Sequence, residues 1–309
     1  MLDNALCEQL VALNDRAGGN CYLLMQNGHQ ETEADTRFND LAEQIQICSM
    51  PVRHPALPPG FSPYLLRIRM NEGMPATLSS LAVSMALADK ATSALRRGVV
   101  QRTCAWIWTS ATAEQLSDNI AERLISPCAS AYAGRRWLRY YDPMVTDLFL
   151  QACTPANRAH YFDCITHWAF IDRWKRLSVH TPDAEAPVGC RNVNWSCIRC
   201  IGAVNQAWIR ARLDAIDVLP EAFDLALDAV ATAHRQGMTE QADLDLFAWQ
   251  SFYLGPRFHA HDVVRALLSA VAAGKRYDEM VYQIDESTWQ RVALEAGLHG
   301  PKSTGWGER

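Results

Sequence analysis

The spacing of hydrophobic positions changes near residue 180 and divides the sequence into two parts. Before this point, short apolar runs typical of strands alternate with segments whose apolar residues recur every three or four positions, as in amphipathic helices. The predicted strands lie near Cys21, Tyr64, Cys104 and Trp137. The predicted helices span 4–14, 35–47, 78–88, 113–124 and 143–152. Residues 1–180 are therefore predicted to form a mixed α/β lobe.

The second part of the sequence has helical spacing throughout. Residues 181–190 are predicted to be a linker, because they lose the apolar periodicity and collect proline, acidic residues and glycine. In the following part, 191–298, one helix is expected to begin at Pro220 and to end near Gly237. Further helices are predicted over 240–253, 263–271 and within 280–294. The expected fold class is α+β/α: an N-terminal α/β lobe, a C-terminal α-helical bundle lobe and a flexible tail at 299–309.

Composition and charge narrow the class of protein. Of the 309 residues, 49% are hydrophobic and 20% are charged, which is ordinary for a globular chain. No apolar run is long enough to span a bilayer and the first residues do not resemble a signal peptide, so we expect a cytoplasmic protein without membrane insertion. The ten cysteines are then expected to be free thiols.

The negative charge lies in the second part of the chain. Lys and Arg balance Asp and Glu up to His180, at 17 each, whereas 12 basic residues stand against 17 acidic ones from Thr181 onward. Binding to nucleic acid or to an anionic membrane surface requires clustered basic residues. The charge pattern therefore argues against nucleic acid as a partner.

The most distinctive motif is a basic and aromatic run at 135–143, Arg-Arg-Trp-Leu-Arg-Tyr-Tyr-Asp-Pro. Together with positions further along the chain, it resembles the domain-of-unknown-function family 4123 of type VI secretion. The segments 21–25, 63–68 and 106–124 are similar to the first strands and helix of that family. The resemblance covers roughly residues 20–180. The matching positions of the motif region are Arg139, Tyr140, Tyr141, Asp142, Pro143, Leu148, Thr154, Pro155, Tyr161, Phe162 and Trp168.

The resemblance implies a non-catalytic adaptor, or chaperone, of bacterial toxin delivery. Its partners would be a cognate secreted effector and the valine-glycine-repeat spike protein of the secretion machine, and no cofactor is implied. Considered as single residues, Asp142 is expected to end a strand and cap the next helix, with Pro143 in its first turn. Tyr140, Tyr141, Trp168 and Trp174 are interpreted as packing residues of the same motif.

Candidate partner-binding residues are arginines and tryptophans. Arg135, Arg136 and Arg139 can hold a carboxylate of a partner through bidentate pairs, or can belong to a solvated strand face. The chain has ten tryptophans, and tryptophan is enriched in binding hot spots. Most must pack in the core, but Trp208 and Trp249 in the helical part are candidate exposed anchors.

A rival hypothesis is a cytoplasmic metal- or cysteine-dependent hydrolase. Cys190, Cys197 and Cys200, with His180 upstream, include one C-x-x-C pair that can share a zinc ion, although the local sequence supplies no fourth thiolate. Buried cysteines acting as small hydrophobic residues are the alternative.

A second group of candidate ligands, His259 and His261 followed by Asp262, can bind a metal or act as a base, or can cap a helix. The sequence has no phosphate-binding glycine loop and no nucleophile elbow. We therefore predict no metal and no cofactor. The hydrolase hypothesis requires that the side chains of one group, either the cysteines with His180 or the two histidines with a carboxylate, come together in one pocket.

Overall fold

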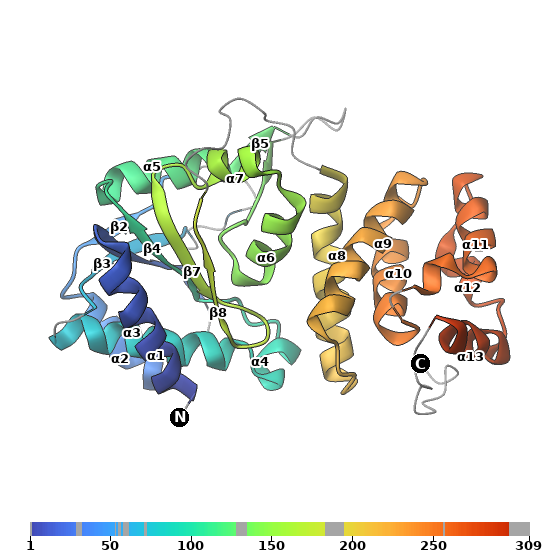
Figure 1. Ribbon diagram of the computed structural model, residues 1–309, viewed down its shortest axis with the longest axis horizontal. Helices are drawn as coiled ribbons and strands as arrows, with labels where there is room; N and C mark the ends of the chain where they lie inside the picture. Colours follow the sequence, from blue (N-terminus) through green and yellow to red (C-terminus); the bar gives the residue numbers. More distant parts are fainter. Residues whose placement is uncertain are drawn as a thin grey trace. The chain divides into compact units, whose positions relative to one another are not determined.

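The computed structural model describes residues 2–28, 33–52, 54, 57, 62–70, 73–127, 135–182, 195–255 and 257–296. The chain divides into two compact units, Met1–Val193 and Asn194–Arg309 (Figure 1). The first unit is mixed α/β, whereas the elements described in the second unit are helices. Of the predicted linker, 183–190 lies outside the described residues, and so does the predicted tail at 299–309.

An antiparallel sheet forms the centre of the first unit. Within the described residues, six strands pair in the order β2-β3-β1-β4-β7-β8, and β5 and β6 form a separate hairpin. Leu23 in the middle of β1 lies opposite Leu66 of β3 and Trp106 of β4. The strands are β1 (Asn20–Met25), β2 (Ile47–Ser49), β3 (Tyr64–Ile68), β4 (Thr103–Thr109), β5 (Ile125–Pro127), β6 (Arg135–Trp137), β7 (Ile165–Ile171) and β8 (Leu177–His180).

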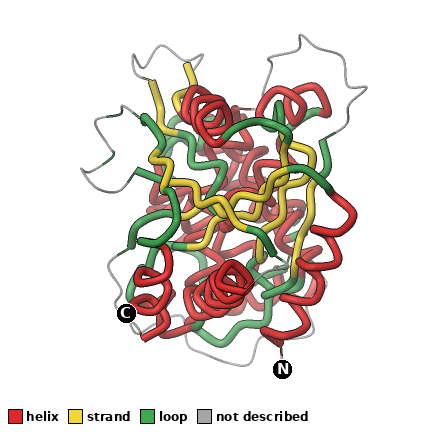
Figure 2. Tube along the Cα trace, turned by 90° about the vertical axis from the view of Figure 1, so that its left-hand side faces the viewer, coloured by secondary structure: helices red, strands yellow, loops and turns green. Residues whose placement is uncertain are grey.

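Helices cover both faces of this sheet (Figure 2). Alternate residues of a strand point to opposite faces, so Cys21, Leu23 and Met25 contribute to one core, which they share with Leu10 and Phe38 from the helices on that side. The helices of the first unit are α1 (Leu2–Ala17), α2 (Glu33–Ala42), α3 (Gly73–Asp89), α4 (Thr92–Arg96), α5 (Ala113–Leu124), α6 (Pro143–Ala152) and α7 (Pro155–Tyr161).

The predicted helices at 113–124 and 143–152 and the predicted strands near Cys21, Tyr64 and Cys104 are confirmed, but some other predictions for this unit were incomplete. The predicted helix 35–47 ends at Ala42, because the chain turns and Ile47 opens β2. The strand predicted to continue to Asp142 ends at Trp137, and a turn closed by a hydrogen bond from the Asp142 amide to the Arg139 carbonyl follows. Strands β7 and β8 were not predicted.

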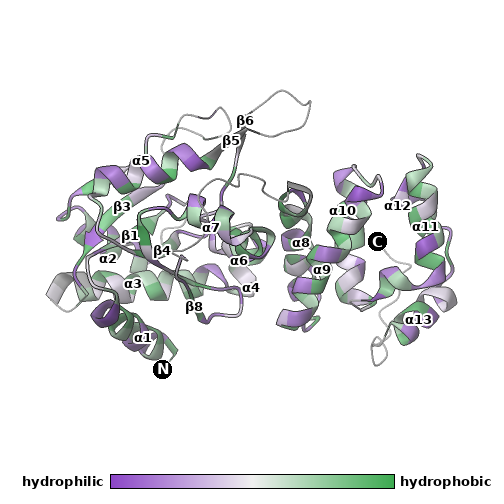
Figure 3. Cartoon of the chain, turned by 45° about the horizontal axis from the view of Figure 1, so that its top comes forward, coloured by the Kyte–Doolittle hydropathy of each residue, from purple (hydrophilic) through white to green (hydrophobic). Residues whose placement is uncertain are grey.

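The second unit is built from helices whose ends follow the sequence signals. Pro220 is the first residue of its helix, as predicted, and Gly237, with φ +108°, follows the C-cap Gln236. Hydrophilic and hydrophobic residues are interspersed along these helices (Figure 3), and the buried residues of α9 include Phe223, Leu227 and Val230. The elements are α8 (Trp195–Leu213), α9 (Pro220–Arg235), α10 (Gln241–Tyr253), the 3-10 helix η1 (Phe258–Ala260), α11 (Asp262–Ala272), α12 (Tyr277–Val281) and α13 (Glu286–Glu295).

The length and hydropathy of the helices show whether any of them could span a membrane. In the part of the chain that the structure describes, no helix combines the length and the apolar character that a bilayer span requires.

Candidate functional site

The motif at 135–143 contains β6 and the turn that leads into α6, and its side chains contact the residue that follows β1. Asp142 is the N-cap of α6, where its Oδ1 accepts a hydrogen bond of 3.0 Å from the Met144 amide, and Pro143 occupies the first turn. The capping role predicted for Asp142 and the first-turn position predicted for Pro143 are confirmed, whereas the strand predicted to end at Asp142 ends at Trp137. The Thr146 hydroxyl donates to the carbonyl of Tyr140, so the turn and the helix are held together. This arrangement is structural rather than chemical.

Arg139 and Tyr141 bind the end of β1. Tyr141 donates a hydrogen bond of 2.9 Å from its hydroxyl to Oε1 of Gln26, and Arg139 donates to the same oxygen over 3.2 Å. Arg139 also pairs with Asp142 at 2.9 Å. Its guanidinium is thus engaged within the unit, which weakens the hypothesis that it holds a partner's carboxylate. Arg135 and Arg136 lie on β6, but their side chains are outside the described part of the structure.

Tyr140 and Trp168 belong to an aromatic cluster on the sheet. The ring of Tyr140 lies 5.4 Å from Phe149, 5.3 Å from Tyr161 and 5.6 Å from Phe162, measured between ring centroids. Trp168 packs edge to face on Phe162 at 5.1 Å. All these residues are buried. Packing in the core therefore accounts for the aromatic residues at these positions of the motif.

Trp174 occupies the turn between β7 and β8. The guanidinium carbons of Arg173 and Arg176 lie 5.7 Å and 5.2 Å from its ring centroid. Arg173 is held by two hydrogen bonds to the Asp147 carboxylate, at 2.9 Å and 2.8 Å, which tie the turn to α6. Trp174 is therefore part of a cation–π stack whose arginines are oriented by acidic neighbours.

A buried ionic cluster lies at the start of β4. Arg102 donates to the carboxylates of Asp35 and Asp89, and all three side chains are buried. Next to Asp89, the Lys90 ammonium donates a hydrogen bond of 2.7 Å to Gln101. The backbone carbonyl of Arg102 accepts a hydrogen bond from the backbone N–H of Gln26. The cluster therefore adjoins Gln26, whose side chain binds Arg139 and Tyr141. The cluster was not predicted from the sequence.

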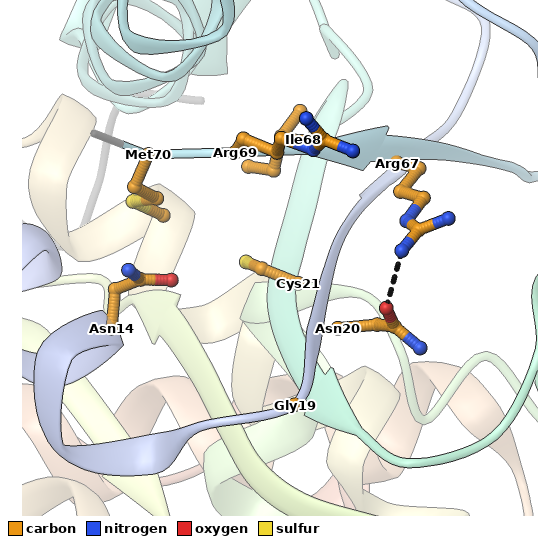
Figure 4. A pocket seen from close by; sticks show the side chains of 8 residues that line it. All are labelled: Asn14, Gly19, Asn20, Cys21, Arg67, Ile68, Arg69 and Met70. Carbon is orange, nitrogen blue, oxygen red and sulfur yellow. Dashed lines mark hydrogen bonds between the residues drawn. The ribbon is translucent and has the colours of Figure 1, made fainter. Parts of the chain in front are cut away.

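Two surface hollows remain as binding candidates. The first, of about 270 Å³, lies where β1 begins and β3 ends (Figure 4). Figure 4 shows Arg67 directed to Asn20, to which it donates a hydrogen bond of 2.7 Å, while Cys21 and Met70 line the other side. Asn14 accepts from the Trp108 indole. These polar groups are already engaged with one another or with the core, which makes this hollow the weaker candidate.

The second hollow, of about 380 Å³, lies on the helical unit and is called the α10 hollow here. Four residues of α10 at helical spacing line it, and α8 and α12 supply the rest, including Tyr282 at the C-cap of α12. Its lining residues are Gln206, Ala207, Arg210, Ala242, Asp245, Leu246, Trp249, Asp278 and Tyr282. It combines aromatic rings with charged groups of both signs.

Trp249 is the centre of the α10 hollow. The guanidinium of Arg210 lies 4.3 Å from its ring centroid, and Tyr253 stacks on it with centroids 4.9 Å apart. The Trp249 side chain is consequently held in one orientation and is 8% exposed. Tyr282, by contrast, is 81% exposed. Trp208, the other predicted anchor, is buried at 2% exposure and does not line this hollow.

The cysteines of the hydrolase hypothesis lie in α8. Cys197 and Cys200 are buried and form no disulfide bond. Burial raises the pKa of both, and that of Cys200 to about 12. Cys190 lies outside the described residues. His180, in β8 of the first unit, packs edge to face on Phe162, and burial lowers its pKa to about 4.

The histidines of the second group lie just before α11. His261 is the N-cap of α11, and its Nδ1 accepts a hydrogen bond of 3.2 Å from the Val263 amide, so the capping interpretation is confirmed. Its Nε2 lies 3.1 Å from Oε2 of Glu295. His259 lies in η1. Among the described residues, no group of three or more His, Cys, Asp or Glu side chains is placed to hold a metal ion.

Arg210, Asp245 and Tyr282 were not predicted as binding residues from the sequence. A signal existed for α10, where Ala242, Asp245, Leu246 and Trp249 recur at spacings of three and four around one acidic residue. Tyr282 and Arg210 come from other helices, and their approach to Trp249 depends on helix packing.

Comparison of the chain with protein-family models, with curated proteins and with solved structures finds no match in any of the three. The resemblance to family 4123 therefore depends on the positions quoted from the sequence.

Proposed function

We propose that this protein is a non-catalytic adaptor, or chaperone, that binds a type VI secretion effector in the bacterial cytoplasm and helps to load it onto the valine-glycine-repeat spike protein. The order of residues in 135–174 suggests this role. In the proposal, an α/β lobe and a helical bundle lobe each supply part of the binding surface. The partners are proteins, with no nucleic acid involved.

The observation that carries the proposal is the α10 hollow. Trp, Tyr and Arg are the residues most enriched in binding hot spots, and the hollow holds one tryptophan, one exposed tyrosine and one arginine within a single concave surface. Trp249 already packs on Arg210 and on Tyr253, so little side-chain entropy is lost there when a partner binds. This surface suits a protein segment.

The pKa values of the α8 cysteines favour an adaptor over the hydrolase. A thiol acts as a nucleophile or as a zinc ligand in its thiolate form. Burial raises the pKa of Cys197 and Cys200, which keeps both thiols protonated near neutral pH. The hydrolase hypothesis has no comparable supporting observation.

The test is co-purification from the native host at native expression levels. Epitope-tagged chain should retain the candidate effector and the spike protein, and Tyr282→Ala should lower the retained amount. Leu294→Ala, which truncates another exposed apolar side chain on α13, is the matched control and should retain as much as wild type. Enzyme-like turnover by the purified chain, abolished by Cys197→Ser or His261→Ala, would contradict the adaptor role.

A further inference from the structure

Asp245 offers an available carboxylate in the α10 hollow. Its Oδ1 accepts a hydrogen bond of 2.7 Å from the amide of Gln241, one turn earlier on α10. It makes no ion pair with another described residue. A neutral amide does not compensate a carboxylate charge, so Asp245 remains able to pair with a cation from outside the unit.

Tyr282 offers an aromatic face. Arg210 and Tyr253 both contact the Trp249 ring, which is 8% exposed, whereas the Tyr282 side chain is 81% exposed. A planar cation can stack on an exposed tyrosine ring. Asp278, which also lines the hollow, accepts a hydrogen bond of 2.8 Å from Arg276, so its charge is already partly balanced.

The charge of the unit favours a basic partner. Between 195 and 296 the sequence has nine Lys or Arg against fourteen Asp or Glu, a net charge of −5. Such a unit attracts cationic segments and repels acidic ones. The one cation in the hollow, Arg210, lies over the Trp249 ring and 3.9 Å from Asp214 on its own helix.

We propose that the α10 hollow receives an arginine side chain from a basic segment of a partner protein. The guanidinium pairs with Asp245 and stacks on Tyr282, while the aliphatic stem lies on Leu246. Arginine fits better than lysine, because its planar group combines stacking with a bidentate carboxylate pair. The inference rests on the proposed role in protein binding and adds the chemistry of the bound segment.

The test uses the purified full chain and two synthetic peptides. The first is acetyl-Ala-Leu-Arg-Ala-Ala-Leu-Arg-Ala-amide, and the second carries citrulline, which has nearly the same shape without charge, at both arginine positions. Titration is followed through the indole Nε1–H signal of Trp249, assigned with Trp249→Phe. We expect the arginine peptide to shift this signal and to bind about tenfold more tightly than the citrulline peptide, since the ion pair and the cation–π contact are both lost.

Variants separate the local contacts from the general charge. Asp245→Asn and Tyr282→Ala should each weaken peptide binding about threefold. Asp262→Asn removes the same charge at a 95% exposed side chain on α11, outside the hollow, and should leave binding unchanged. Leu294→Ala should also have no effect.

Several outcomes would overturn the proposal. Equal binding of the citrulline peptide, an unchanged Trp249 signal at millimolar peptide, or equal loss in Asp262→Asn would each do so. Light scattering tests whether a second copy of this chain is the occupant, since a dimer that Asp245→Asn dissociates would replace the proposal. If the effector complex forms and resists both hollow variants, the adaptor function stands and this inference fails.

Discussion

Lys90 donates a hydrogen bond of 2.7 Å from Nζ to Oε1 of Gln101, and both side chains are buried. The neighbouring Asp89 is bound by Arg102, and Lys90 makes no ion pair with a described residue. Burial lowers the pKa of Lys90 to about 8, although the Asp89 charge opposes this shift. Because this buried ammonium group donates to neutral oxygens, its charge destabilises the folded first unit, and the stability of the unit depends on pH in the alkaline range.

We expect the stability contributed by Lys90 to rise with pH. Between the folded pKa of about 8 and the unfolded value of 10.5, the unfolded chain holds the proton that the folded chain has released. The free energy of unfolding therefore increases across this window, by up to about 3 kcal/mol. Urea denaturation of wild type and Lys90→Met at pH 7 to 10.5 measures the difference, in which other titrating groups cancel. A constant difference would show that Lys90 stays charged.

Arg102→Leu should strongly destabilise the first unit. The substitution leaves Asp35 and Asp89 buried without their cation, and breaking a buried ion pair costs about 3–5 kcal/mol. Arg265→Leu is the control, because Arg265 pairs with Asp262 at the surface, where an ion pair contributes little. Urea midpoints provide the measurement, and equal losses in the two variants would contradict the buried cluster.

His180 should make the protein less stable in acid. Burial lowers its pKa from 6.5 to about 4, so the stability that depends on the neutral ring is fully present above pH 6.5 and is lost as pH falls towards 4. Its Nε2 is buried without a hydrogen bond, and the ring packs on Phe162.

The matched variant is His180→Phe, which keeps an aromatic ring and removes the titration. The loss of thermal stability between pH 7 and pH 5 should be smaller in this variant than in wild type. An NMR titration of the His180 ring that gives a midpoint near 6.5 would refute the prediction.

Asp142→Ala should cost more than the loss of a simple helix cap. Removing an N-cap costs about 1 kcal/mol, but this substitution also leaves Arg139 without its carboxylate, so we expect about 2–3 kcal/mol. Thr154→Ala removes the N-cap of α7, which has no ion pair, and should cost about 1 kcal/mol. Chemical denaturation of both variants compares the two caps, and similar losses would mean that the Arg139 pair contributes little.

Alkylation should separate Cys164 from the buried cysteines of α8. The pKa of all three thiols is raised by burial, but Cys164 is exposed whereas Cys197 and Cys200 are buried. Because access differs, native protein at pH 8 should react with iodoacetamide at Cys164 before it reacts at Cys197 or Cys200. Mass spectrometry of digested protein gives the order of labelling. Rapid labelling of Cys197 would indicate a thiolate and would revive the hydrolase hypothesis.

Local signals in the sequence predicted the elements that depend on local chemistry. Helices 113–124 and 143–152, the Asp142 cap and the proline at the start of α9 all follow from short-range patterns of apolar, capping and proline residues. Strand β7 was missed because Ile165–Ile171 is buried along most of its length, so it lacks the alternation that marks a strand with one exposed face.

The candidate site was less predictable, because its residues meet through packing between helices. Trp249 was identified by its residue type, but Arg210 and Tyr282 come from α8 and the end of α12. The ionic cluster has the same property, since Asp35 and Asp89 stand 67 and 13 residues before Arg102. Such separations leave no periodic signal in the sequence.

The long separation within the ionic cluster has a consequence for folding. Arg102 is neutralised only after both α2, which carries Asp35, and the end of α3, which carries Asp89, have docked on the sheet. An intermediate in which one of these helices is detached would bury a guanidinium group with part of its compensation missing, at a cost of several kcal/mol. Partly assembled forms are thereby disfavoured, and the first unit is expected to unfold in a single cooperative transition.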